Sequence, residues 1–191
     1  DFVEIPDNEV IDIDRSNSFT FEGWIYPAAV SGTILNKQLA VATEEGYNLN
    51  LSSQNLVFSL TGDATAGVVM VATSSVTIPL NTWTHVAVTY DGSSNANNIN
   101  FYINGVLDVS KSVGINNFSV GSSSTTGSLR IGEYAFGSFA FTGTMDEIRI
   151  WKDSVKTDFS DRYTQLNGNE SKLVAYYTFD EAASGTATDV V

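Results

Sequence analysis

Short runs of alternating apolar and polar residues recur along the chain, and turn-forming residues separate them. Alternation with a period of two residues is typical of strands that bury one face. The clearest runs span residues 2–5, 18–26, 33–36, 47–52, 55–60, 68–73, 82–90, 98–103, 106–112, 128–132, 143–151 and 173–179. This pattern predicts an all-β protein built as an antiparallel sandwich, not from alternating βα units.

The strongest local turn signal is the pair Asn104-Gly105, which lies between two β-rich runs. Asn and Gly both tolerate positive φ angles, which a type I′ hairpin turn requires at its two central positions. The pair therefore predicts a hairpin. Residues 114–127 are rich in Ser, Asn, Thr and Gly, and we expect them to form a long loop.

One short helix is expected over residues 157–166. Phe159, Tyr163 and Leu166 have the spacing i, i+4 and i+7, which places side chains on one face of a helix. Two aspartates stand in the first turns, where they interact favourably with the helix dipole. We expect this helix to cap one end of the sandwich.

The length of 191 residues suits one domain, and 42% hydrophobic residues are enough to form a packed core. No repeat at a fixed period and no Pro-rich linker divides the chain, so we expect a single domain over residues 1–191. The chain opens on a strand pattern and not on a signal peptide. We therefore expect it to be a piece of a larger protein.

The charge is strongly acidic, with 22 Asp and Glu residues against 9 Lys and Arg residues and a formal net charge of −13. No Lys or Arg occurs between positions 38 and 110, so a basic surface for phosphates is missing from this stretch. The chain also has no cysteine and no apolar run long enough to cross a bilayer. Nucleic acid binding, membrane insertion, disulfides and thiolate catalysis are thereby disfavoured, whereas soluble cations and neutral polymers remain as partners.

Seven phrases occur in a characteristic order along nearly the whole chain. They are DFVEIP (1–6), SFTFEGWIYP (18–27), NTWTHVAVTYDG (81–92), FYING (101–105), LRIG (129–132), FTGTMDEIRIW (141–151) and LVAYYTFDE (173–181). Together they resemble the laminin G-like jelly-roll domains of the concanavalin A-like lectin/glucanase superfamily. The resemblance implies a two-sheet antiparallel jelly roll. It leaves the function open, because this fold serves lectins, adhesins, appendages of polysaccharide-degrading enzymes and spacers.

Catalytic constellations are missing from the expected positions. Glucanase relatives carry their acids on one strand as Glu-x-Asp-x-x-Glu, and no such run exists here. Adjacent acids such as Asp146 and Glu147 would point to opposite faces of a strand. His85 is the only histidine and stands in mid-strand without a Gly-x-Ser-x-Gly turn, so we expect a buried strand histidine and not a member of a catalytic triad.

Aromatic residues are the first candidates for a sugar site, because a flat ring can stack on the C–H face of a pyranose. The three tryptophans stand inside strand phrases, so we expect them in the core: Trp24, Trp83 and Trp151. Tyr134, Phe136 and Phe139 lie instead in a Gly-punctuated connection, and we take them as candidate ligand contacts. The alternative is that this connection folds back over the end of the sandwich.

Asp146 is the candidate metal ligand. It shares strand parity with Ile148 and Ile150, so its carboxylate is expected on an apolar face, where it needs a partner. That partner is either a cation with oxygen ligands or a basic side chain or backbone N–H. In glucanase relatives the corresponding Asp binds a structural calcium together with the turn before the SFTF-like strand. Carried over, the resemblance implies a Ca²⁺ site with Asp146 and Asn17 as ligands.

The sequence thus favours a non-catalytic extracellular or cell-surface binding module with a structural calcium. Its expected partners are a polysaccharide or other glycan, a surface protein, and other domains of the same parent chain. One alternative is a structural spacer repeat in a large adhesin. A less favoured alternative is a divergent polysaccharide-degrading enzyme.

Overall fold

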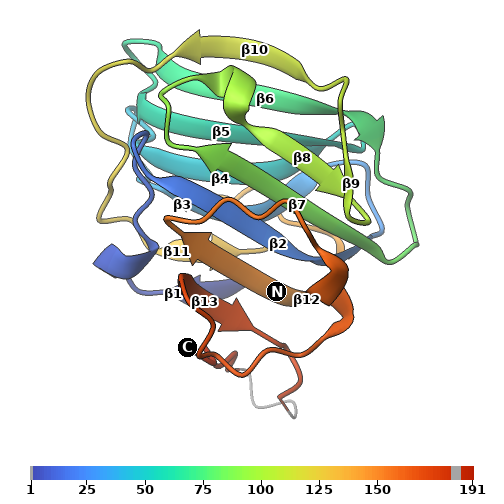
Figure 1. Cartoon of the computed structure of the whole chain (residues 1–191). Coiled ribbons are helices and arrows are strands. Elements are labelled where there is room, and N and C mark those ends of the chain that lie inside the picture. The colour runs from blue at the N-terminus through green and yellow to red at the C-terminus, as the bar shows by residue number, and fades with distance from the viewer. Residues whose placement is uncertain (1, 182–185) are drawn as a thin grey trace.

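The computed structural model describes residues 2–181 and 186–191 and shows two antiparallel sheets packed face to face (Figure 1). Seven strands form the first sheet, in the order β1 (Val3–Ile5), β11 (Leu129–Ile131), β3 (Gly32–Gln38), β4 (Gly46–Ser52), β5 (Asn55–Asp63), β6 (Val68–Thr77) and β10 (Ser112–Asn117). Six strands form the second, in the order β13 (Leu173–Tyr177), β12 (Gly143–Lys152), β2 (Ser18–Pro27), β7 (Thr84–Asp91), β8 (Asn100–Ile103) and β9 (Val106–Leu107).

Helical structure in the described residues consists of three 3₁₀ turns: η1 (Glu9–Ile11), η2 (Ala96–Asn98) and η3 (Ser160–Tyr163). None of the helices in this part of the chain has the length and apolar character needed to cross a membrane. The predicted all-β jelly-roll sandwich is confirmed.

Aromatic side chains from both sheets meet in the core. The rings of Phe19 and Phe21 on β2 lie 4.8 Å apart, and Phe19 also packs against Phe58 of the opposite sheet at 5.2 Å. Tyr90 of β7 contacts Phe19 at 5.4 Å. All four side chains are buried, so each strand places its apolar set between the sheets, as alternation requires.

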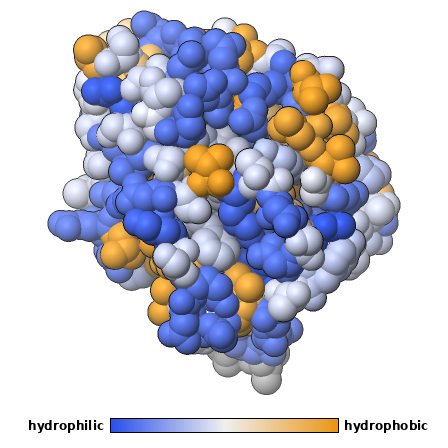
Figure 2. Space-filling view, in the orientation of Figure 1, coloured by the Kyte–Doolittle hydropathy of each residue, from blue (hydrophilic) through white to orange (hydrophobic). Residues whose placement is uncertain are grey.

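The outer sides of the two sheets, which face away from each other, differ in their cover. On β4 the buried residues Tyr47, Leu49 and Leu51 alternate with Asn48 and Asn50, which point outward. The segment between β12 and β13 instead crosses the outer side of the six-stranded sheet (Figure 1). The same view as a space-filling surface is dominated by hydrophilic residues with separate hydrophobic patches (Figure 2).

The predicted hairpin at Asn104-Gly105 is confirmed. The two residues have φ angles of 52° and 81°, and Ile103 pairs with Val106 on either side of them. These positive angles match the twist of the flanking strands, which explains why Asn and Gly occupy the turn.

The expected helix over 157–166 is wrong, because only the 3₁₀ turn η3 forms within it. Side chains of the six-stranded sheet instead hold this segment through its backbone carbonyls. Trp24 Nε1 donates to the carbonyl of Arg162 at 2.9 Å, and Arg149 donates to that of Thr164 at 2.6 Å. Phe159 is buried while Tyr163 is largely exposed, so the spacing of apolar residues did not mark one helix face.

The expected strand 106–112 and loop 114–127 are also corrected. The chain leaves the six-stranded sheet after β9 and enters the seven-stranded sheet as β10, so the loop covers only residues 118–128. Asp108 marks the crossing point: its buried carboxylate accepts hydrogen bonds from the hydroxyl of Ser75 at 2.6 Å and the N–H of Ser110 at 3.0 Å. A side chain that binds the opposite sheet ends the strand where alternation alone would continue it.

Candidate functional site

A groove of about 520 Å³ lies on the outer side of the seven-stranded sheet. Polar side chains of β3, β4 and β5 form its floor, including Asn48, Asn50, Ser59 and Thr61. These residues face outward because their neighbours along each strand are buried in the core. The volume is within the range of small-molecule and saccharide sites.

Hydrogen bonds between amide side chains link the outward-facing residues of β3 and β4 at the groove, both within each strand and from one strand to the other. Asn36 Nδ2 donates to Asn48 Oδ1 at 3.3 Å and to Gln38 Oε1 at 3.0 Å, and Asn48 Nδ2 donates to Asn50 Oδ1 at 3.0 Å. Asn50 Nδ2 in turn donates to the carbonyl of Leu51 at 3.1 Å. Each amide offers two donors and two acceptor positions, so this network fixes the side chains and leaves bonding capacity for a ligand.

Aromatic residues of the β11–β12 connection form one rim. The hydroxyl of Tyr134 donates to Glu44 Oε2 at 3.1 Å, and burial together with the Glu44 charge raises the pKa of Tyr134 to about 12. Phe139 lines the groove with 56% of its surface exposed and has a φ angle of 61°, which is unusual for a bulky residue. Both rings are thus available to a ligand.

The rim is attached to the floor by backbone hydrogen bonds. The N–H of Thr33 donates to the carbonyl of Phe139 at 2.8 Å, and the N–H of Ala135 donates to Asn36 Oδ1 at 3.1 Å. Arg130 Nη1 holds the carbonyl of Ala135 at 2.9 Å. These contacts hold the unusual conformation of Phe139 in place.

Thr33 contributes a polar group without a partner. Its side chain is 1% exposed and lines the groove, and its Oγ1 has no hydrogen-bond partner among the described residues. An unpaired buried hydroxyl is unfavourable, and burial keeps this oxygen out of reach of a ligand in the groove.

The opposite side of the groove is apolar. Val69 and Val71 of β6 and Ile115 of β10 line it, while the aromatic rim lies beyond β3 on the other side of the floor. No Lys or Arg is among the lining residues, and Glu44 is the one carboxylate there. The groove therefore combines apolar and aromatic walls with a polar floor, and Glu44 of the loop between β3 and β4 adds one acidic group.

The family model of the Concanavalin A-like lectin/glucanases superfamily matches residues 1–158. The chain belongs to this superfamily. A search of curated proteins finds no match.

Solved structures share the superfamily fold at low sequence identity. A Bacteroides ovatus protein described as a candidate carbohydrate binding protein aligns with a TM-score of 0.67 and 20% identity, over 99% of this chain and 53% of its own. The binding domain of botulinum neurotoxin serotype G aligns with a TM-score of 0.58 and 14% identity, over 82% of this chain and 38% of its own. The heptameric SAP-like pentraxin of Limulus polyphemus aligns with a TM-score of 0.53 and 16% identity, over 90% of this chain and 83% of its own. The chain thus spans about half the length of the Bacteroides protein.

The three aromatic candidates of the β11–β12 connection differ in their position relative to the groove. Tyr134 and Phe139 line the groove, whereas the ring of Phe136 packs against that of Tyr134, with centroids 5.4 Å apart, and is not part of the lining. The polar floor was missed by sequence reasoning. Asn48 and Asn50 at alternate positions between apolar residues are the signal that could have revealed it, because alternation places both on one outward face.

Of the three tryptophans expected in the core, Trp151 is buried in a hydrophobic cluster, whereas Trp24 is half-buried and Trp83 is exposed. Trp83 is 44% exposed, because it stands in the turn before β7 begins. Trp24 and Trp151 are on the outer side of the six-stranded sheet, where Trp151 is buried beneath the covering segment. The expected buried strand position of His85 is confirmed: it is 1% exposed within β7, and its Nε2 lies 3.2 Å from Glu22 Oε2.

The expected orientation of Asp146 is wrong. A bulge interrupts the pairing of β12 with β2 between Asp146 and Arg149, and Glu147 has a φ angle of 54° within it. The extra residue reverses the parity, so Asp146 pairs with Trp24 on the outer side while Ile148 stays in the core. Asp146 and Glu147 consequently line the same pocket instead of pointing to opposite faces.

Asp146 and Asn17 do not form one calcium site. Asp146 pairs with Trp24 of β2, and Asn17 directly precedes β2, seven residues before Trp24, which corresponds to about 20 Å of extended chain. The Asn17 side chain accepts a hydrogen bond from the N–H of Asp14 at 3.0 Å and donates to Asp153 at 3.3 Å. Within residues 2–181 and 186–191, no three acidic or histidine side chains are grouped to hold a metal ion. Asp146 and Asn17 therefore lie too far apart to ligate one ion together.

Proposed function

We propose that the chain is a non-catalytic module that binds a neutral glycan in the groove of the seven-stranded sheet. The observation that carries the proposal is the combination of an aromatic rim with a polar amide floor in one groove. A pyranose has apolar C–H faces and hydroxyl edges, and this groove offers a complementary surface to each. The carbohydrate-binding description of the Bacteroides ovatus neighbour supports the same ligand class.

The charge of the groove favours a neutral ligand. Glu44 lies within it and no basic residue lines it, so a uronic acid or a sulfate group would meet repulsion without compensation. We therefore expect neutral oligosaccharides to bind and their carboxylated or sulfated counterparts to bind at least roughly tenfold more weakly, as measured on a glycan array and by calorimetry.

A binding role is favoured over hydrolysis by the acids that line the groove. A glycosidase of the common two-acid type needs a pair of carboxyl groups about 5 to 9.5 Å apart on either side of the bond. Glu44 is the one carboxylate among the lining residues, and its Oε2 already accepts the hydrogen bond from Tyr134. No second acid at the groove supplies the missing role.

The test compares rim variants on a panel of neutral oligosaccharides. Tyr134→Ala and Phe139→Ala are each expected to weaken binding by roughly tenfold or more, the usual effect of removing an anchoring aromatic side chain. Phe136→Ala is the matched control, because this ring belongs to the same connection but does not line the groove. The proposal fails if no neutral glycan binds, or if the rim variants bind as well as the control.

A further inference from the structure

A second pocket, of about 450 Å³, lies on the opposite side of the molecule from the groove. It is on the outer side of the six-stranded sheet, next to the segment that crosses this sheet. Trp24, Trp83 and Tyr163 supply aromatic walls, and Asp146 and Asp180 supply carboxylates. The groove and this pocket share no residue, so one can be tested without the other.

The aromatic walls are open to solvent. Trp83 is 44% exposed and Tyr163 is 71% exposed, although large aromatic side chains are usually buried. The ring of Trp24 lies 5.2 Å from that of Tyr163, and its Nε1 is held by the carbonyl of Arg162. The walls therefore present ring faces fixed in position by neighbouring contacts.

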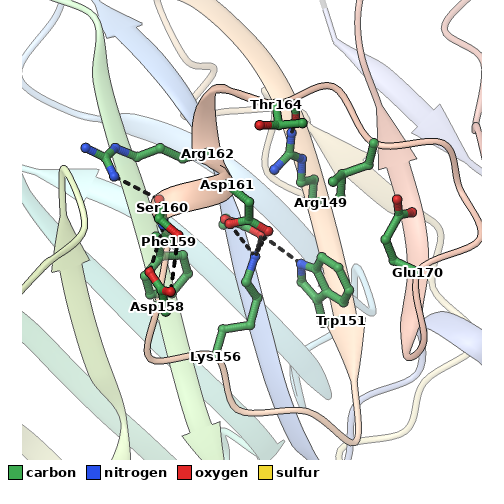
Figure 3. A network of polar contacts seen from close by, with 12 residues as sticks. Arg149, Trp151, Lys156, Asp158, Phe159, Ser160, Asp161, Arg162, Thr164 and Glu170 are labelled. Carbon is green, nitrogen blue, oxygen red and sulfur yellow. Dashed lines mark hydrogen bonds and ion pairs between the residues drawn. The ribbon is translucent and has the colours of Figure 1, made fainter.

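The rings already hold one cation of the protein itself. The guanidinium carbon of Arg162 lies 4.5 Å from the centroid of Tyr163, and its Nη1 donates to the carbonyl of Phe159 at 2.8 Å (Figure 3). Aromatic faces attract cations through their ring quadrupole. The wall is thus of a kind that suits a positively charged ligand.

The carboxylates make the pocket negative without compensation at Asp146. Glu147 is paired with Arg149 at 2.6 Å and accepts from the hydroxyl of Tyr176 at 2.6 Å. Asp146 has no ion pair among the described residues. Burial, followed by the charge of Glu147 and that of Asp180, raises the pKa of Asp146 above its ordinary value, so an incoming positive charge would relieve an unfavourable field.

We infer that this pocket is a second binding site, for a protonated amino sugar. The ammonium group would be placed at Asp146, and the sugar ring would stack on the exposed faces of Trp83 and Tyr163. Gln165 adds an amide for the hydroxyls, since its Nε2 makes only a 3.4 Å contact with Asp180. An inorganic cation is the poorer occupant, because the described acids do not gather into a metal-holding group and the walls are aromatic.

The experiment titrates the protein with a glucosamine trimer and with its N-acetylated counterpart, which keeps the rings but removes the charge. The glucosamine trimer is expected to bind roughly tenfold or more tightly, corresponding to about 1.4 kcal/mol or more for a charge-assisted contact. Asp146→Asn should remove this preference. Asp153→Asn changes the net charge equally and should keep the preference, because Asp153 directly follows the far end of β12.

Two further variants decide where the glucosamine binds. Trp83→Ala, in an exposed turn, should weaken binding of the glucosamine trimer, whereas Tyr134→Ala in the groove should leave it unchanged. The inference is overturned if neither trimer binds, if both bind equally, if Asp146→Asn keeps the preference, or if Tyr134→Ala abolishes it. Failure of the groove proposal would appear separately, as absence of binding to neutral glycans while the glucosamine trimer still binds.

Discussion

Replacement of Glu22 by alanine is expected to lower the free energy of unfolding by about 3–5 kcal/mol, the usual cost of breaking a buried ionic group. The Glu22 side chain is buried beneath the segment that crosses the six-stranded sheet. Its Oε1 accepts from Lys156 Nζ at 2.6 Å and from Trp151 Nε1 at 2.9 Å, and its Oε2 lies 3.2 Å from His85. The variant leaves Trp151 Nε1 without its acceptor and removes the buried partner of Lys156 and His85, and urea unfolding measures the loss.

Asp161→Asn is the matched control, because Asp161 pairs with the same Lys156 at 3.0 Å but is 40% exposed (Figure 3). An exposed ion pair contributes about 1 kcal/mol or less. The interpretation of Glu22 as the centre of the network is wrong if the two variants lose the same stability.

Acid should weaken the same interaction. Burial raises the pKa of Glu22, but the hydrogen bond with His85 and the charge of Lys156 outweigh it and lower the pKa from 4.5 to about 2. The contribution of ionised Glu22 to the free energy of unfolding is complete above pH 4.5. It shrinks as Glu22 of the unfolded chain takes up its proton, and it is lost as the pH falls through about 2. Its full size is roughly 3 kcal/mol. The difference in the free energy of unfolding between wild type and Glu22→Gln should shrink by roughly 3 kcal/mol between pH 6 and pH 2. A difference that stays constant over this range would contradict the lowered pKa of Glu22.

Gly46→Ala is expected to destabilise the fold by about 4 kcal/mol or more, because the backbone cannot yield at this site. Gly46 begins β4 with a φ angle of 126°, and an added Cβ would overlap the carbonyl oxygen of Lys37 on the neighbouring strand β3. The substitution therefore combines an unfavourable backbone conformation with a clash between two paired strands. Thermal or urea unfolding gives the measurement.

Gly67→Ala serves as its control. Gly67 also has a positive φ angle, 69°, but a Cβ there would meet no atom within 4 Å. The variant should lose only about 1–2 kcal/mol, the cost of a left-handed conformation. Equal losses for the two glycines would show that the clash with Lys37 is relieved by movement of the strands.

Alternation in the sequence was enough to predict both sheets, because burial of one strand face leaves a period of two that is visible in single residues such as Leu49 and Leu51. It failed where one tertiary contact changes the path of the chain. The bulge at Glu147 reverses the side of Asp146, and the carboxylate of Asp108 ends a strand by binding the other sheet. Neither event leaves a periodic signal.

Only the aromatic rim of the candidate site was predicted from the sequence. Tyr134 and Phe139 were recognisable because large rings in a Gly-rich connection have no packing role set by periodicity. The hydroxyl of Thr33 was not, since its isolation depends on which neighbours the fold places around it. Trp24 and Trp83 were wrongly expected in the core, because an apolar residue in a strand phrase does not reveal which side of a sheet it covers.

The two hydrogen bonds that attach the aromatic rim of the groove to β3 have a kinetic consequence. Because the Thr33 N–H holds Phe139 and Asn36 holds Ala135, the rim loses its conformational freedom when the protein folds and not when a ligand arrives. Under the proposed function, the glycan meets a groove that already has its bound shape. Ligands that differ in fit should therefore associate at similar rates and differ in how long they stay.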